Sequence, residues 1–128
     1  MPATTIEVRR KYTTEQEIAL IDAVQAALVE GLRIPEWTKT IRFIAHEPHR
    51  FAVDRSRDER FTLVSIDLFP GRSIEAKRRL YAALVRNLAR FDIPADHVKI
   101  VLREVARENW GLRGVPSSEI ELPYEVEV

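Results

Sequence analysis

The sequence predicts an α+β fold that is α/β-like in its connections, built from two β-α-β units in tandem. The first indication is a weak internal repeat, in which Ile34-Pro35-Glu36 recurs as Ile93-Pro94-Ala95. The second is that each half reads as a strand, a turn, a hydroxyl residue that caps a helix, and a strand after the Ile-Pro break. With 128 residues, 45% of them hydrophobic, the chain matches a single domain over residues 1–128, with repeats at about 2–47 and 60–105.

The first half opens with a short predicted strand at Thr4–Val8. Thr14-Glu15-Gln16-Glu17 has the spacing of a capping box, in which a Thr hydroxyl and a Glu carboxylate each satisfy a free backbone N–H, so we expect a helix to start there. The helix ends at Ile34-Pro35, because proline disfavours a helical conformation in the preceding residue. A second strand follows at Thr40–His46. The predicted buried stripe of the helix consists of Ile18, Ile21, Val24, Leu28 and Leu32.

The second half repeats this order with a more apolar strand. Phe61–Phe69 is almost continuously apolar and β-rich, which is typical of a central strand. Pro70-Gly71 turns the chain and Ser73 caps the second helix. The helix ends at Ile93-Pro94, and Val98–Val105 is the fourth predicted strand.

The two units together predict a four-stranded sheet with two helices on one face, because β-α-β crossovers are right-handed. Short C-terminal strands are expected beyond it. Ile120–Val128 alternates apolar and polar residues, and Pro123 confines such a strand to a sheet edge. The face without helices would leave residues such as Leu63, Val64 and Ile66 open to water, so we expect a homo-oligomer.

Composition and charge exclude several classes of protein. Twenty Lys and Arg balance twenty Asp and Glu, so no overall field favours nucleic acid or an anionic membrane. The absence of Cys excludes disulfides and thiolate sites. Met1–Tyr12 lacks the apolar core of a secretion signal, and no apolar run reaches the length of a membrane span. We expect a cytoplasmic protein that binds neither nucleic acid nor membrane.

Pro2 is the first candidate for chemistry. Methionine before proline is ordinarily removed, which would leave a secondary amine at the start of the chain. An α-amino group has a pKa near 8, and burial or a neighbouring cation lowers it, so the amine could act as a neutral base. The alternative, which this residue alone does not exclude, is a frayed terminus without function.

The turn from Phe69 to Ser73 is the second candidate. It places Arg72 at the end of a strand and the start of a helix. Free N–H groups, the positive end of the helix dipole and a guanidinium together form a carboxylate-binding corner. An ordinary turn with a solvated Arg is the alternative.

Neither a metal nor a cofactor is predicted. His46-Glu47-Pro48-His49 lacks the helical spacing of a zinc-hydrolase motif, and its proline indicates a loop. The loop that follows is rich in charge of both signs, which cancels and is typical of a solvated surface. Its charged residues are Glu47, Arg50, Asp54, Arg55, Arg57, Asp58, Glu59 and Arg60.

The stretches MPATTIEV, IRFIAHEP, FTLVSIDLFPGRSIEAKRRLY and ENWGLRG resemble the tautomerase superfamily, in the long-chain branch that contains malonate semialdehyde decarboxylase. The resemblance implies a tautomerase/MIF-like fold, a homotrimer and a catalytic amino-terminal proline, matched by Pro2. Arg72 matches an arginine that binds the substrate carboxylate or carbonyl oxygen. Trp110 and Leu112 fall where this branch places apolar pocket residues.

Two positions depart from the decarboxylase pattern. Thr38 stands where the decarboxylase has an aspartate, and Pro70 stands where it has a second arginine. These departures favour a keto–enol tautomerase or isomerase of a small 2-oxo or unsaturated carboxylic acid, with Pro2 as base and Arg72 as its partner. Thr38, Trp110 and Leu112 are then the predicted substrate-binding residues. A decarboxylase- or hydratase-type lyase acting on a 3-oxo or halogenated acid, and a non-catalytic trimeric binding protein, remain open as alternatives.

Overall fold

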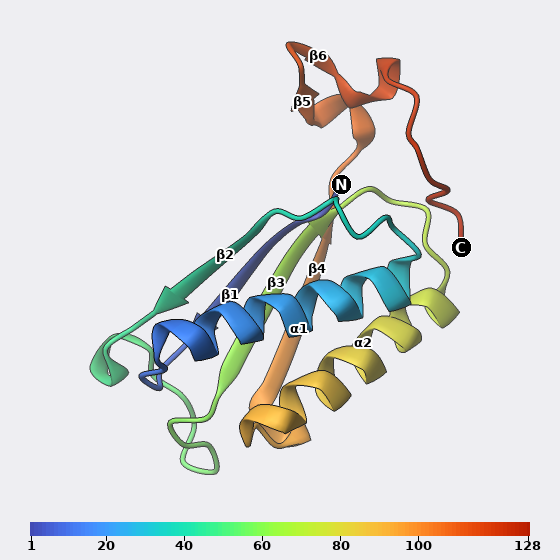
Figure 1. Cartoon of the computed structure of the whole chain (residues 1–128). Coiled ribbons are helices and arrows are strands. Elements are labelled where there is room, and N and C mark those ends of the chain that lie inside the picture. Colours follow the sequence, from blue (N-terminus) through green and yellow to red (C-terminus); the bar gives the residue numbers. More distant parts are fainter.

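The computed structural model describes residues 1–128 and has two helices packed on one face of a four-stranded mixed sheet (Figure 1). The sheet contains β1 (Ala3–Val8), β2 (Ile41–Ala45), β3 (Thr62–Leu68) and β4 (Val98–Glu104), and the helices are α1 (Thr14–Leu32) and α2 (Ile74–Leu88). A small antiparallel pair, β5 (Gly111–Leu112) and β6 (Val115–Pro116), lies beyond the end of the sheet (Figure 1). The predicted fold class is confirmed.

Strand pairing explains how the two units meet. The order is β2-β1-β3-β4, with β1 parallel to β2 and β3 parallel to β4. The units join through β1 and β3, which pair antiparallel with Ala3 opposite Asp67. The start of β1 therefore lies beside the end of β3, where the chain turns into α2.

The core lies between the helices and the covered face of the sheet. Ile6, Val64 and Ile66 of the central strands are fully buried against Leu28 and Leu84 of the helices. The helices themselves approach closely at Gly31 of α1, because a Cβ added there would lie 2.6 Å from the Leu80 Cα.

Two details of the first helix differ from the prediction. Thr13, not Thr14, is the N-cap: its hydroxyl accepts a hydrogen bond from the Gln16 N–H at 3.1 Å, and the Gln16 side chain accepts one from the Thr13 N–H at 2.9 Å. The predicted box was wrong by one residue because a glutamine serves the role that was assigned to a glutamate. Ile18 is 56% exposed, since it lies on a different side of the helix from the buried Leu20 and Val24.

The uncovered face of the sheet is less apolar than predicted. Val64 and Ile66 lie under the helices, so the prediction that they belong to the face without helices was wrong. Side chains alternate along a strand, and of the three residues named only Leu63 belongs to the other face. Polar pairs share that face: Arg103 with Asp67 at 2.6 Å, Arg42 with Thr5 at 2.9 Å, and His46 with Glu7 at 2.9 Å.

The predicted strand at Ile120–Val128 does not form. The segment has no strand partner and runs back toward the start of α2, where the Ser73 hydroxyl donates a hydrogen bond to the Val128 carbonyl at 2.7 Å (Figure 1). Attachment to the start of α2 takes the place of edge pairing, and the short C-terminal strands are β5 and β6 instead. Neither helix combines the length and apolar character needed to span a membrane.

The close approach of the helices predicts that Gly31→Ala lowers stability. Alanine ordinarily favours a helix over glycine by about 1 kcal/mol, but overpacking against the Leu80 backbone costs about 1–3 kcal/mol. Urea denaturation of Gly31→Ala should show a lower free energy of unfolding. Gly111→Ala is the matched control, because a Cβ there meets nothing within 4 Å. A Gly31→Ala protein as stable as the wild type would contradict this packing.

Candidate active site

Arg72 is held at the end of β3 by the turn that the sequence predicted. Gly71 has a φ of 123°, and Ser73 caps α2 by accepting the Ala76 N–H at 3.1 Å. Arg72 is 6% exposed, and its Nη1 donates to the Phe69 carbonyl at 3.2 Å. Its Nε and Nη2 are buried without a partner. Because unpaired buried donors are costly, this guanidinium is suited to receive the oxygen of a ligand.

The amino terminus lies at the same edge of the sheet. Continuing the pairing of β1 with β3 places Pro2 beside Leu68 and Met1 beside Phe69. Pro2 is buried, and its nitrogen is joined to Met1 by a peptide bond, so it has no proton in this form of the chain. The free amine is that of Met1, which donates a hydrogen bond to the Tyr124 hydroxyl.

The environment of this amine favours its neutral form. Burial lowers the pKa of the Met1 amine from 8.0 to about 5, with further lowering by the positive charges of Arg72 and Arg107. A neutral amine has a free electron pair and can accept a proton. The corner of the sheet therefore combines a base with buried N–H donors.

Arg107 supplies a second positive charge that the sequence analysis missed. Its Nη2 donates to the carbonyls of Ser117 and Ile120, both at 2.7 Å, and its Cζ lies 5.5 Å from the centre of the Phe69 ring. The Nε of Arg107 is buried without a partner. No motif surrounds this residue in the sequence, since its position depends on how the chain folds back after β4.

Tyr124 is the other group that the sequence analysis missed. It belongs to the irregular C-terminal segment that had been predicted as an edge strand. Burial raises the pKa of the Tyr124 phenol, while the charge of Arg72, its side-chain contact with the phenol and the charge of Arg107 oppose the rise. The phenol therefore stays protonated near neutral pH and lies among donors.

The predicted apolar residues take different places. Leu112 lines a cavity of about 430 Å³ together with Met1 and the exposed Trp37. Trp110 packs edge-on against the Phe69 ring at 5.1 Å, and its Nε1 donates to the Val105 carbonyl at 2.9 Å. Leu112 thus lies at the site, whereas Trp110 supports it from behind Phe69.

Thr38 closes the turn before β2. It is 5% exposed, its hydroxyl donates to the Pro35 carbonyl at 2.7 Å, and its carbonyl accepts from the Gln25 Nε2 at 3.3 Å. The hydroxyl proton is already used within the turn. Only the oxygen electron pairs of Thr38 would remain for contact with a substrate.

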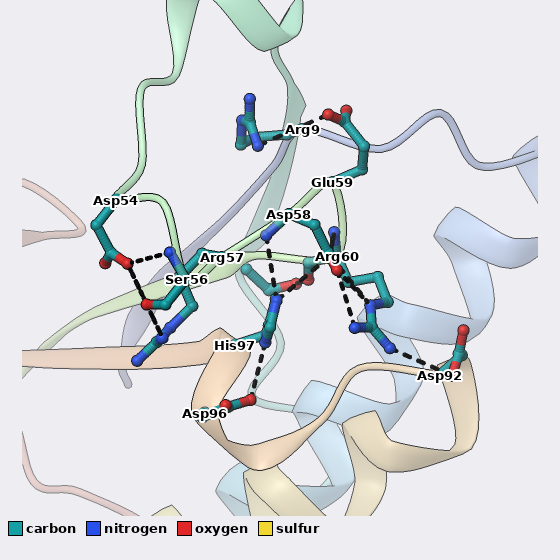
Figure 2. A network of polar contacts seen from close by, with 11 residues as sticks. Arg9, Asp54, Ser56, Arg57, Asp58, Glu59, Arg60, Asp92, Asp96 and His97 are labelled. Atoms are coloured by element: carbon teal, nitrogen blue, oxygen red, sulfur yellow. Dashed lines mark hydrogen bonds and ion pairs between the residues drawn. The ribbon is translucent and has the colours of Figure 1, made fainter.

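A larger cavity, of about 680 Å³, lies at the opposite end of the sheet, near the charged loop. Beside it, the buried His97 accepts a hydrogen bond from the Asp58 N–H at 3.2 Å and pairs with Asp96 at 2.8 Å (Figure 2). Arg60 pairs with Asp58 at 2.9 Å. None of the residues that line this cavity has a buried polar atom without a partner, so the network anchors the loop and offers no comparable site. The structure contains no group of three or more metal-ligating side chains.

Comparisons with known proteins identify relatives of this chain. The family model described as "Tautomerase enzyme" matches residues 38–113. A probable tautomerase of Ralstonia nicotianae (strain ATCC BAA-1114 / GMI1000) is 34% identical over 62 residues, which are 48% of this chain and 89% of the relative. The crystal structure of the FG41 malonate semialdehyde decarboxylase inhibited by 3-bromopropiolate is 32% identical with a TM-score of 0.71, over 84% of this chain and 86% of that chain.

A native fused 4-OT has the same fold, with a TM-score of 0.85 at 16% identity over 92% of this chain and 98% of that chain. Another fused 4-OT structure, described as an asymmetric trimer, has a TM-score of 0.83 at 17% identity, over 91% of this chain and 96% of that chain.

The contacts of Arg107 predict that Arg107→Met loosens the C-terminal segment. Loss of two hydrogen bonds from a charged donor, each contributing about 1.5–3 kcal/mol, should free the segment after Ser117. Hydrogen exchange followed by mass spectrometry should show faster exchange over residues 117–128, with β3 unchanged. Arg55→Met, in the exposed loop, is the control, and equal exchange in both variants would show that Arg107 does not anchor the segment.

Proposed function

The chain belongs to the tautomerase family, and from that premise we propose that it is a cofactor-independent keto–enol tautomerase or isomerase of a small 2-oxo or unsaturated carboxylic acid. One observation carries the proposal: the Arg72 guanidinium is 6% exposed, and two of its nitrogens are unpartnered beside the chain's amine. A base next to unused donors is the minimum that enolisation requires.

The proposed base is the amine of Pro2 after loss of Met1. Pro2 is buried next to Met1, so we expect burial and the two arginines to lower the pKa of its amine as well. The neutral amine takes a proton from the carbon next to the substrate carbonyl. The electron pair of that C–H bond becomes the C=C bond, and negative charge develops on the oxygen. The unpartnered N–H groups of Arg72 stabilise this oxygen or the neighbouring carboxylate.

Arg107 is proposed to provide the second cation. Pro70 stands where the decarboxylase pattern has another arginine, but Arg107 reaches the amine and Tyr124 from the segment after β4. Positive charge at the site therefore does not depend on the residue at position 70. Leu112 and Trp37 line the cavity that would receive the apolar part of the substrate. Of the other predicted substrate-binding residues, Trp110 would act through its packing on Phe69, and Thr38 through the electron pairs of its hydroxyl oxygen.

We also propose a homotrimer. The fused 4-OT structures that share this fold are described as trimers, and the face of the sheet opposite the helices is uncovered in the isolated chain. Ile44 and Val101, each 39% exposed, and the half-buried Leu63 are apolar residues of that face that an assembly would cover.

A lyase reaction is the second candidate, because a malonate semialdehyde decarboxylase is 32% identical to this chain. In that reaction the protonated amine acts as an acid. Burial and the two arginines lower the amine pKa and so disfavour the protonated amine at neutral pH. In addition, Thr38 lacks the carboxylate that the decarboxylase pattern has at this position. If Met1 is retained, Pro2 has no basic nitrogen, and a binding protein without catalysis becomes the better description.

Substitution of the two proposed catalytic residues should slow ketonisation of an aryl enolpyruvate. A general base contributes about 10²–10⁴-fold to the rate, and Pro2→Ala should lose part of this factor and lower kcat, because it exchanges the ring-held secondary amine for a freely rotating primary amine. Arg72→Ala should lower kcat/KM by about 10²–10³-fold, as loss of an oxyanion donor does. Absorbance of the enol gives the rates, and intact mass establishes whether Met1 is absent. Equal rates in wild type, both variants and the exposed-loop control Arg55→Ala would exclude the proposal.

The pH profile should distinguish a base from an acid. The surroundings lower the amine pKa, so the neutral form predominates above that pKa and is lost below it. For a tautomerase, kcat/KM should rise with pH through the pKa of the Pro2 amine, which we expect below the ordinary value for an α-amino group, and then level off. A rate that instead falls as pH rises through this pKa would favour the lyase reaction.

A further inference from the structure

The hydroxyl of Tyr124 stands out among the groups of the site because the reaction described above does not use it. With Met1 present it accepts a hydrogen bond from the Met1 amine, and loss of Met1 removes this contact. A phenol has one proton to donate as well as electron pairs to accept with. No oxygen of the protein accepts the proton of Tyr124, although the side chain is half-buried.

The groups that face the phenol explain why its proton is free. Arg72 and Arg107 act on Tyr124 as cations, and arginine offers donors and no acceptor. A hydroxyl surrounded by donors turns its proton toward whatever acceptor enters the site. The acceptor that a 2-oxo acid brings there is its carbonyl oxygen.

The segment that carries Tyr124 is fixed on both sides. Before it, Arg107 holds the carbonyls of Ser117 and Ile120 at 2.7 Å. After it, Val126 lies 3.3 Å from the position of a Gly71 Cβ, and the Val128 carbonyl accepts from Ser73 at 2.7 Å. These contacts do not involve the phenol hydroxyl, and they hold the segment of Tyr124 beside Gly71 and Ser73, the neighbours of Arg72.

We propose that Tyr124 is a second proton-transfer residue of this site, which donates its phenolic proton to the substrate oxygen while the amine takes the proton from carbon. This inference rests on the proposed tautomerase function. In the direction from ketone to enol, the C–H bond breaks and its proton goes to the amine. The C–H electrons form the C=C bond, the carbonyl π electrons move to oxygen, and that oxygen takes the Tyr124 proton. The phenolate then regains a proton from the ammonium, so both protein groups return to their starting states.

Kinetics of Tyr124→Phe test the proton transfer. Loss of general acid catalysis should lower kcat by about 10²-fold or more. KM should change little, because Arg72 and Arg107 still bind the acid. Tyr12→Phe is the matched control: it removes the same atom from a buried hydroxyl without a partner, just after the opposite end of β1. A kcat for Tyr124→Phe equal to that of Tyr12→Phe would overturn the proposal.

Binding of oxalate tests the hydrogen bond without any turnover. Oxalate resembles the enolate of a 2-oxo acid and does not react. A hydrogen bond to a charged oxygen corresponds to about 10-fold or more in affinity, so titration calorimetry should show weaker binding by this factor in Tyr124→Phe and not in Tyr12→Phe. Equal affinity in wild type and Tyr124→Phe would show that the phenol does not donate to the ligand.

The two measurements separate this inference from the function on which it rests. Activity that depends on Pro2 and Arg72 but not on Tyr124 would leave the tautomerase standing and remove the role of the phenol. If the wild-type protein has no tautomerase activity but its oxalate binding requires Tyr124, the proposed function is rejected, while the role of Tyr124 as a hydrogen-bond donor to the ligand is supported. Circular dichroism of each variant verifies folding, and a kcat loss accompanied by unchanged oxalate affinity would also contradict the proposal.

Discussion

Antiparallel pairing of β1 with β3 is the constraint on which the rest of this structure depends. Each β-α-β unit alone has parallel strands, and the join between them places the start of β1 beside the end of β3. The end of β3 is also where α2 begins, so the amine and Arg72 meet although they are far apart in sequence. Burial of Ile6, Val64 and Ile66 holds that register, since a shift of one residue would turn them away from the helices.

The site is electrostatically unfavourable when it is empty. Two guanidinium groups and an amine share a partly buried corner, and three of the arginine nitrogens there have no partner. Burial is the main cause that lowers the pKa of the Met1 amine to about 5, and repulsion from Arg72 and Arg107 contributes to the lowering. An anionic ligand would supply the missing acceptors. The same feature that lowers the stability of the empty corner thus creates basicity in the amine and affinity for a carboxylate.

Local patterns in the sequence predicted the features that are built locally. The turn at Pro70-Gly71, the cap at Ser73 and the position of Arg72 follow from neighbouring residues, and the structure has all of them. Tyr124 and Arg107 could not be predicted, because irregular segments bring them to the site and no periodicity describes such segments. Alternating residues over Ile120–Val128 favoured a strand, but the attachment to Ser73 determines the path of that segment. The uncovered face was misjudged for a related reason: a continuous apolar run does not reveal which residues point to the helices.

The polar side-chain pairs of the uncovered sheet face affect how firmly subunits of this chain would associate. Arg103 with Asp67 and His46 with Glu7 satisfy one another within a single chain, while Ile44 and Val101 contribute only small apolar areas. Burial of such a surface would stabilise an assembly less than burial of an apolar surface of the same area. Dilution of the proposed homotrimer would therefore release subunits that expose little apolar surface. Each released subunit would still contain its own amine, guanidinium and phenol groups.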